Sequence, residues 1–229
     1  MFDLTQFGLY LLYILLPVLA VYILYLIITK AFEDMGFSSI EAIIIVFVSY
    51  LLGEGFIDKY VGFSFSNVHL FSYGYWALGL NVGGVVIPVI LSIYLIIKNK
   101  LKLSKVLFGT IIVAIIAFFV TQPIPEKGIV SFFPYWLLPA IFAGLASIFL
   151  SRKNFRQAAP LAYISGTLGV LMGADFLHLP ELLSYPIKQS TPAVIGGADV
   201  FDMIFITGLL AVIVDGILMY HKKSMEKHS

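Results

Sequence analysis

Long runs of apolar residues, separated by short polar segments, make up most of this chain. Seven of these runs approach the length of about 20 residues that an α-helix needs to cross a hydrocarbon layer about 30 Å thick. They cover residues 7–29, 39–57, 78–97, 106–121, 132–150, 160–179 and 198–219. The chain lacks the strand-length alternation of apolar and polar residues that is typical of membrane barrels. The pattern therefore predicts an all-α transmembrane bundle of about seven spans, in a single domain of residues 1–229.

Composition agrees with a membrane location. Hydrophobic residues make up 60% of the chain and charged residues 12%, and the mean hydropathy is +1.00. In soluble domains about a quarter of the residues are charged. We therefore expect an integral membrane protein of a prokaryotic plasma membrane, with the lipid bilayer as its main partner. The first run follows no basic segment and has no small-residue cleavage site, so we expect it to be retained as a helix.

The lysines and arginines predict an orientation, because they collect in cytoplasmic loops. With seven spans, 11 of the 14 fall on one side of the membrane. These are Lys30, Lys98, Lys100, Lys102, Lys105, Arg152, Lys153, Arg156, Lys222, Lys223 and Lys227. We therefore expect the N-terminus outside and the C-terminus in the cytoplasm. Because topology explains the basic residues, they do not indicate a nucleic-acid partner.

Several classes of chemistry are excluded or disfavoured. The chain has no cysteine, which excludes disulfide bonds and thiol catalysis. Its four histidines show no spacing of metal ligands, and no motif for a soluble cofactor is present. We expect neither a metal ion nor a cofactor.

A faint internal repeat is visible. Leu-Leu-Pro at residues 15–17 recurs at 137–139, and the pair Gly83-Gly84 recurs as Gly196-Gly197. These matches predict two parallel halves, 7–97 and 132–219, joined by a linker helix at 106–121, as in some transporters. Chance similarity between apolar helices is the alternative.

Three acids stand out in the predicted spans. Asp175 lies inside the sixth span near its outer end, and Asp199 and Asp202 begin the seventh, which returns from the same side. An acid in hydrocarbon is costly and usually faces a bundle interior or a water-filled cavity. If two carboxylates meet in such a site, one keeps its proton and the other acts as a base. Alternatively, Asp199 or Asp202 only caps the seventh helix.

The remaining acids of interest have structural interpretations. Glu41 follows Ser38 by three residues, the spacing of a capping box. We expect Asp215, near the cytoplasmic end of the last span, to be solvated or paired at the interface. Glu54 and Asp58 lie at the outer end of the second span, where they reach the headgroups.

Two resemblances add to this picture. The segment GGADVFDMIFITGLLA resembles the Gly-x-Gly-Asp segment of intramembrane aspartyl proteases, the presenilin, signal peptide peptidase and prepilin peptidase group. The resemblance implies that Asp175 and Asp199 are the catalytic pair, although Ala198 replaces the usual second glycine. Separately, GLNVGGVVIPVILSIYL, AYISGTLGVLMGADFL and GGADVFDMIFITGLLA look like segments of a prokaryotic membrane family known only as a domain of unknown function.

Two functions follow as hypotheses. The first is intramembrane peptide hydrolysis by Asp175 and Asp199, with Asp202 as the substitute, on a transmembrane peptide substrate. The second is transport of a small solute or cation through an acid-lined cavity on the outer side. In that cavity Asn81, Gly83, Gly84, Gly196 and Gly197 bind the substrate. A scaffold without activity is the third option, and the sequence does not indicate the oligomeric state.

Overall fold

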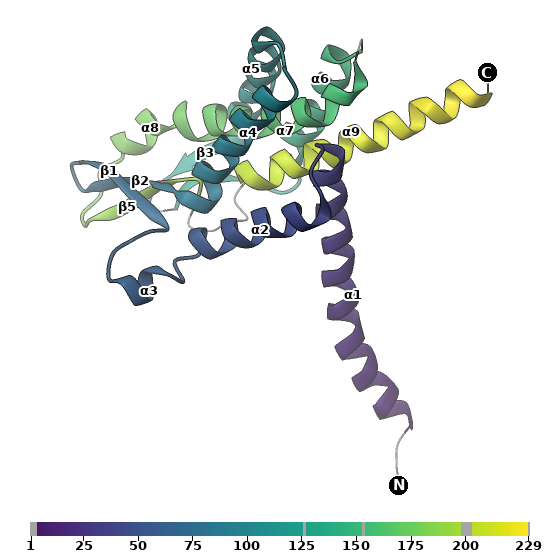
Figure 1. Ribbon diagram of the computed structural model, residues 1–229. Coiled ribbons are helices and arrows are strands. Elements are labelled where there is room, and N and C mark those ends of the chain that lie inside the picture. Colours follow the sequence, from purple (N-terminus) through teal and green to yellow (C-terminus); the bar gives the residue numbers. More distant parts are fainter. Residues whose placement is uncertain (1–3, 126, 153, 198–202, 229) are drawn as a thin grey trace.

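The computed structural model describes residues 4–125, 127–152, 154–197 and 203–228 (Figure 1). Most of these residues are helical. The helices are α1 (Leu4–Asp34), α2 (Ser39–Gly53), α3 (Asp58–Val61), α4 (Ile87–Lys98), α5 (Leu103–Val120), α6 (Leu138–Leu150), α7 (Ala158–Val170), α8 (Leu179–Ser184) and α9 (Met203–His228). Two π-helical segments, η1 (Val82–Val86) and η4 (Leu171–Phe176), adjoin α4 and α7, and two 3₁₀ turns, η2 (Tyr135–Leu137) and η3 (Phe155–Gln157), precede α6 and α7.

Four helical stretches in the described residues are long and apolar enough to cross a membrane: Leu9–Asp34, Leu103–Val120, Phe155–Ser184 and Met203–Tyr220. Three shorter apolar helices cover Ser39–Gly53, Val82–Lys98 and Tyr135–Leu150. Each predicted run thus contains a helix, but only four helices have the full length of a span. The seven-span plan and its orientation stay predictions.

Helix α7 is the centre of the bundle, packed against α4, α5, α6 and α9. Every position of α7 except Leu168 is buried. Small residues allow this close packing: Gly166 lies against Thr207 and Gly208 of α9, and Gly169 lies against Val113 of α5. The glycines before Asp175 therefore face two different helices.

Helix α1 stands apart from this bundle (Figure 1). Its large side chains from Leu9 to Ile27 are exposed, whereas its last turns, with the buried Ala31 and Phe32, pack against α2 and α9. A helix that is apolar all round is typical of one surrounded by lipid. We therefore expect lipid to surround the exposed apolar surface of α1.

Two small sheets lie at the end of the bundle opposite the C-terminus of α9. Their strands are β1 (Asn67–Tyr73), β2 (Trp76–Asn81), β3 (Thr121–Ile124), β4 (Gly128–Ser131) and β5 (Thr191–Ile195). β1 and β2 form an antiparallel hairpin whose two-residue turn contains Gly74 at φ 58°, and β5 pairs with β2 in parallel. β3 and β4 form a separate hairpin.

These strands correct two sequence predictions. The bundle is not all-α, and the third run begins as strand β2 rather than as helix. An apolar run of six residues such as WALGLN does not distinguish a strand from a helix by hydrophobicity alone. Strand pairing satisfies the backbone groups of these segments without helical bonds.

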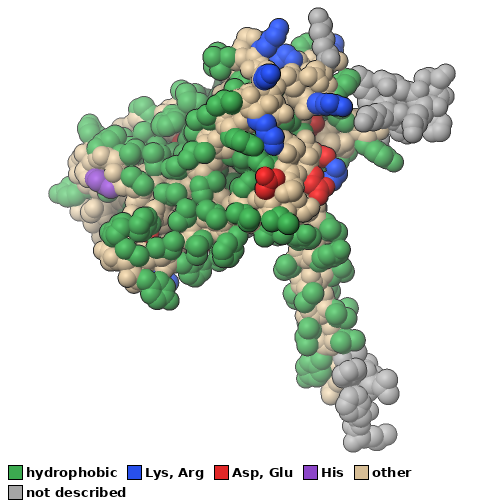
Figure 2. Space-filling view, in the orientation of Figure 1, with side chains coloured by type: hydrophobic (Ala, Val, Ile, Leu, Met, Phe, Trp, Pro, Cys, Tyr) green, Lys and Arg blue, Asp and Glu red, His purple; other side chains and the backbone are tan. Residues whose placement is uncertain are grey.

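The opposite end of the bundle carries most of the described Lys and Arg residues, and we call it the basic end. Here the turns between helices meet: Lys98 Nζ donates to the Gly36 carbonyl at 2.7 Å, and Gln157 Nε2 donates to the Asn99 carbonyl at 3.0 Å. Figure 2 shows Lys and Arg side chains gathered over this part of the surface.

Candidate functional site

Asp175 lies in the π-helical segment η4, where α7 continues toward the two sheets. It is half-buried and lines two cavities. At the neighbouring Gly173, a Cβ would collide with the Ala114 carbonyl of α5, so a side chain is excluded at this contact. π-Helical bulges are frequent at functional sites because they change the direction in which side chains point.

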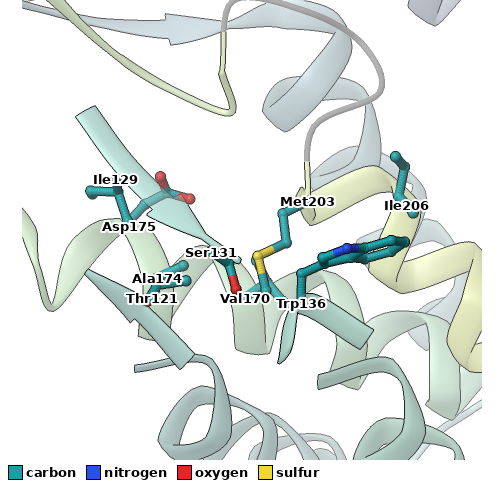
Figure 3. Close-up of a pocket in the computed structure, with 9 residues that line it drawn as sticks. All are labelled: Thr121, Ile129, Ser131, Trp136, Val170, Ala174, Asp175, Met203 and Ile206. Carbon is teal, nitrogen blue, oxygen red and sulfur yellow. The ribbon is translucent and has the colours of Figure 1, made fainter. Parts of the chain in front are cut away.

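The first cavity, called the α9 cavity, has a volume of about 240 Å³. Its lining comes from β3, β4, η2, the end of α7, η4 and the start of α9: Thr121, Ile129, Ser131, Trp136, Val170, Ala174, Asp175, Met203 and Ile206. Figure 3 shows the Asp175 carboxylate beside Ile129, with Met203 and Trp136 on the other side of the cavity. The walls are largely apolar, and Asp175 is the single ionisable residue among these nine.

The second cavity, called the β5 cavity, has a volume of about 230 Å³. All five residues of β5 line it, together with Lys127, Gly128 and Ile129 of the β3–β4 hairpin and Leu179 and Leu182 at α8. Side chains of a strand alternate between its two faces. Since consecutive residues all line the cavity, the backbone edge of β5 must border it.

The hydrogen-bonding groups on that edge follow from the sheet register. Thr191 N donates to the Tyr75 carbonyl, so Thr191, Ala193 and Ile195 direct their backbone groups toward β2. Pro192 and Val194 direct theirs away from β2, and β5 has no second strand partner within the described residues. A proline is tolerated there because its missing N–H faces the unpaired edge.

The two other predicted catalytic acids, Asp199 and Asp202, lie outside the described residues. The positions on either side of their segment are described. Gly197 lines the β5 cavity, and Met203 lines the α9 cavity. Asp175 lines both cavities, so each of these two described residues shares a cavity with Asp175.

The predicted substrate-binding residues form a packed junction between β2 and β5. Gly84 is in such close contact with the Gly196 carbonyl that a Cβ would collide with it, and a Cβ on Gly83 would collide with the Ser49 carbonyl. Gly196 and Gly197 have φ values of 87° and 66°, which favour glycine. The two Gly-Gly pairs thus each follow one of two parallel neighbouring strands. The internal repeat itself stays a prediction.

Asn81 holds this junction together. It is fully buried, its amide group donates to the Gly53 carbonyl and to Asn67 Oδ1 at 3.1 Å each, and its Oδ1 accepts from Gly84 N at 2.7 Å. All three partners are within the chain. The assignment of Asn81 and its neighbouring glycines to substrate binding stays a prediction.

Comparison with known families now places the chain. Residues 59–214 match the family model described as "Protein of unknown function (DUF1614)". The chain belongs to this family. The match confirms the sequence resemblance to a domain of unknown function, and it covers the structure from α3 into α9, including Asp175 and both cavities. Comparison with curated proteins and with solved structures finds no match for this chain.

Within the DUF1614 region, sequence reasoning missed the hairpin β3–β4 and the side chains it contributes. Thr121, Ser131 and Trp136 line the α9 cavity. Thr121 ends the predicted linker helix, Ser131 lies between the predicted runs, and Trp136 lies in the fifth run. The signal in the sequence was the polar segment TQPIPEKG between two apolar runs, which is a turn pattern. Its position beside Asp175 depends on tertiary packing.

His178, three residues after Asp175, is 5% exposed. Its ring stacks on Phe118 with centroids 4.4 Å apart, and Nε2 lies 3.1 Å from the Phe118 carbonyl. These contacts fix α8 against α5. No group of three metal-binding side chains occurs among the described residues.

The sequence predictions for three other acids compare differently with the structure. Glu41 and Ser38 form the predicted capping box, which is confirmed. Asp58 accepts hydrogen bonds from Ser66 Oγ at 2.6 Å and Phe65 N at 2.7 Å, so it organises its loop rather than simply reaching headgroups. The prediction for Asp215 was wrong. It is 3% exposed and accepts a hydrogen bond from Ser147 Oγ at 2.7 Å, because α9 packs against α6.

Proposed function

We propose that this DUF1614 protein hydrolyses peptide bonds within the membrane, using Asp175 and one of Asp199 and Asp202 as a pair of carboxyl groups. The observation that carries the proposal is that Asp175 lines the β5 cavity together with Gly197 and the α9 cavity together with Met203. Asp199 is two residues from Gly197, and Asp202 is adjacent to Met203. The proposal requires one of these two acids to approach the Asp175 carboxylate.

The reaction needs only the two carboxyl groups and water. The ionised carboxylate removes a proton from water, whose oxygen attacks the carbonyl carbon of the peptide bond, while the protonated carboxyl group donates a hydrogen bond to the carbonyl oxygen. The tetrahedral intermediate then breaks its C–N bond, and the leaving nitrogen takes up the proton that the first carboxylate removed from water. Two carboxyl groups in a largely apolar site share one proton readily, since both cannot ionise easily.

The edge of β5 supports a peptide as the substrate. An extended peptide lying in the β5 cavity would accept a hydrogen bond from Val194 N–H and donate to the carbonyls of Pro192 and Val194. The opposite wall, from Lys127 to Ile129, and the apolar Leu179 and Leu182 would enclose its side chains. Such a peptide would lie beside Asp175, which lines the same cavity.

The transport hypothesis has less support from the geometry. It requires Asn81 to face the solute, whereas Asn81 is fully buried and its amide group has partners in Gly53, Asn67 and Gly84. The function proposed therefore rests on Asp175 and not on the Asn81 junction.

Cleavage of a membrane peptide tests the proposal. The purified full-length protein in lipid nanodiscs is incubated with a library of single-span peptides, and products are identified by mass spectrometry. Asp175→Asn should abolish cleavage, a loss of at least about 1000-fold, because it removes one member of the acid–base pair. Glu54→Gln, which changes an acid outside both cavities, should leave the rate unchanged.

Two results would contradict the proposal. One is cleavage that survives in Asp175→Asn. The other is absence of cleavage by the intact protein together with a solute or cation flux in liposomes that depends on Asp175, which would favour transport.

A further inference from the structure

A third cavity, of about 690 Å³, lies at the basic end where α1 meets α7 and α9, and we call it the α1 cavity. Its volume is within the range of about 300–1,000 Å³ typical of small-molecule sites. Most of its walls are apolar: Leu26, Ile27 and Ala31 of α1, Ala159 of α7, and Ile213, Ile217 and Met219 of α9. It shares no lining residue with the cavities around Asp175 and is independent of the proposed hydrolysis.

Three charged side chains interrupt these apolar walls: Lys30, Asp34 and Asp215. Lys30 Nζ lies 2.5 Å from Asp34 Oδ1, with the Lys30 side chain 66% exposed and that of Asp34 31% exposed. Asp215, at 3% exposure, is the deepest of the three. The cation is therefore at the rim and an acid is at the base. Figure 2 shows acidic and basic side chains side by side where α1 leaves the body.

Asp215 has no ion-pair partner among the described side chains, because the ion pairs found there join Lys30 to Asp34 and His178 to Glu181. Its Oδ1 accepts a hydrogen bond from Ser147 Oγ. The next residue, Gly216, presents no side chain, and a Cβ there would lie 3.5 Å from Asp34 Oδ2. Asp34 and Asp215 thus border the same space from two helices. A buried carboxylate is costly unless a cation compensates it.

We propose that the α1 cavity binds a phospholipid with a primary ammonium headgroup, phosphatidylethanolamine. Its ammonium group donates hydrogen bonds to Asp215 and Asp34, its phosphate contacts Lys30 at the rim, and its chains lie along the apolar walls of α1 and α9. The headgroup carries a positive ammonium group at its tip and a negative phosphate next to it. These charges are complementary to the acid at the base of the cavity and to Lys30 at its rim. Phosphatidylcholine has no N–H to donate, and phosphatidylglycerol has no cation.

Native mass spectrometry of the full-length protein tests this proposal. The protein is presented with an equimolar mixture of phosphatidylethanolamine, phosphatidylcholine and phosphatidylglycerol of identical chains, and retained lipids are counted. We expect phosphatidylethanolamine to be retained at least about tenfold over the other two, as charge-assisted hydrogen bonds of this kind allow. Equal retention of the three lipids would overturn the proposal.

Variants locate the binding. Asp215→Asn and Asp34→Asn should each remove the preference for phosphatidylethanolamine, and Lys30→Gln should weaken retention of all three phosphate-bearing lipids. Glu54→Gln, an acid distant from this cavity, should behave as the unchanged protein. If Asp215→Asn does not fold, the partly exposed Asp34→Asn decides, since its side chain is not part of the core. A preference that persists in Asp34→Asn would contradict the proposed site.

Discussion

At the scale of single residues, the acids of this protein lie in different environments and have different structural roles. Glu41 caps a helix, Asp58 holds a loop, and Asp215 is buried beneath a cavity. Asp175 differs from these, because it faces two cavities at once. The chemical type of a residue therefore says less about its role than the hydrogen-bond donors and the space around it.

We expect the loop held by Asp58 to be sensitive to pH. Burial raises the pKa of Asp58, but hydrogen bonds from Ser66, Phe65 and Ser64 outweigh this effect, so the pKa lies below its ordinary value of 3.8. A lowered pKa in the folded protein means that the ionised form stabilises the loop. This contribution is fully present above about pH 4. It is lost as the pH falls through the lowered pKa.

Hydrogen exchange checks this expectation. In Asp58→Asn at neutral pH, the backbone amides of Phe65 and Ser66 should exchange faster than in the unchanged protein, and the difference should shrink as the unchanged protein is acidified below its folded pKa. Lys59→Gln, at the neighbouring position, should have no such effect. Unchanged protection of both amides in Asp58→Asn would refute the role given to Asp58.

At the scale of elements, the central packing of α7 and η4 depends on the absence of side chains at particular glycines. A Cβ on Gly173 would collide with the Ala114 carbonyl of α5. The added Cβ could be accommodated only if η4 moved away from α5, and η4 carries Asp175. The position of the candidate site therefore depends on this contact.

Gly173→Ala should destabilise the protein by about 1–3 kcal/mol, the usual cost of overpacking, and should also lower any activity that requires Asp175. Gly216→Ala is the matched control, because its Cβ would make an ordinary contact at 3.5 Å and alanine is the better helix former by up to about 1 kcal/mol. The stability of both variants is measured by unfolding in mixed detergent micelles, followed by circular dichroism. Equal stability of Gly173→Ala and the unchanged protein would contradict the contact.

The same elements indicate how far the sequence could predict the structure. Apolar length located a helix in every predicted run, and the Ser38–Glu41 spacing located a cap, because both signals are local. Strand β2 was mistaken for part of a helix, since its pairing with β5 joins residues more than 100 positions apart. The site was found only in part: Asp175 was recognisable as an intramembrane acid, whereas Trp136 and the β3–β4 hairpin reach it through tertiary packing.

At the scale of the whole molecule, the two ends of the bundle have different character. One end has the sheets, the α9 and β5 cavities and Asp175, and the other has the helix turns with their Lys and Arg residues and the α1 cavity. Helices α1 and α2 both lie outside the region matched by the DUF1614 family model. The family region thus contains the candidate hydrolytic site, while the proposed lipid site needs α1 as well.

The distance between the Asp175 carboxylate and those of Asp199 and Asp202 tests the central claim most directly. It can be measured by electron cryomicroscopy of the full-length protein with a peptide isostere that has a hydroxyl group in place of the scissile carbonyl. We predict that this hydroxyl lies about 2.6–3.2 Å from Asp175 and from one of the other two acids, with the peptide extended along β5. If both other carboxylates lie beyond about 6 Å from Asp175, too far for one water to bridge, the two-carboxylate mechanism is contradicted.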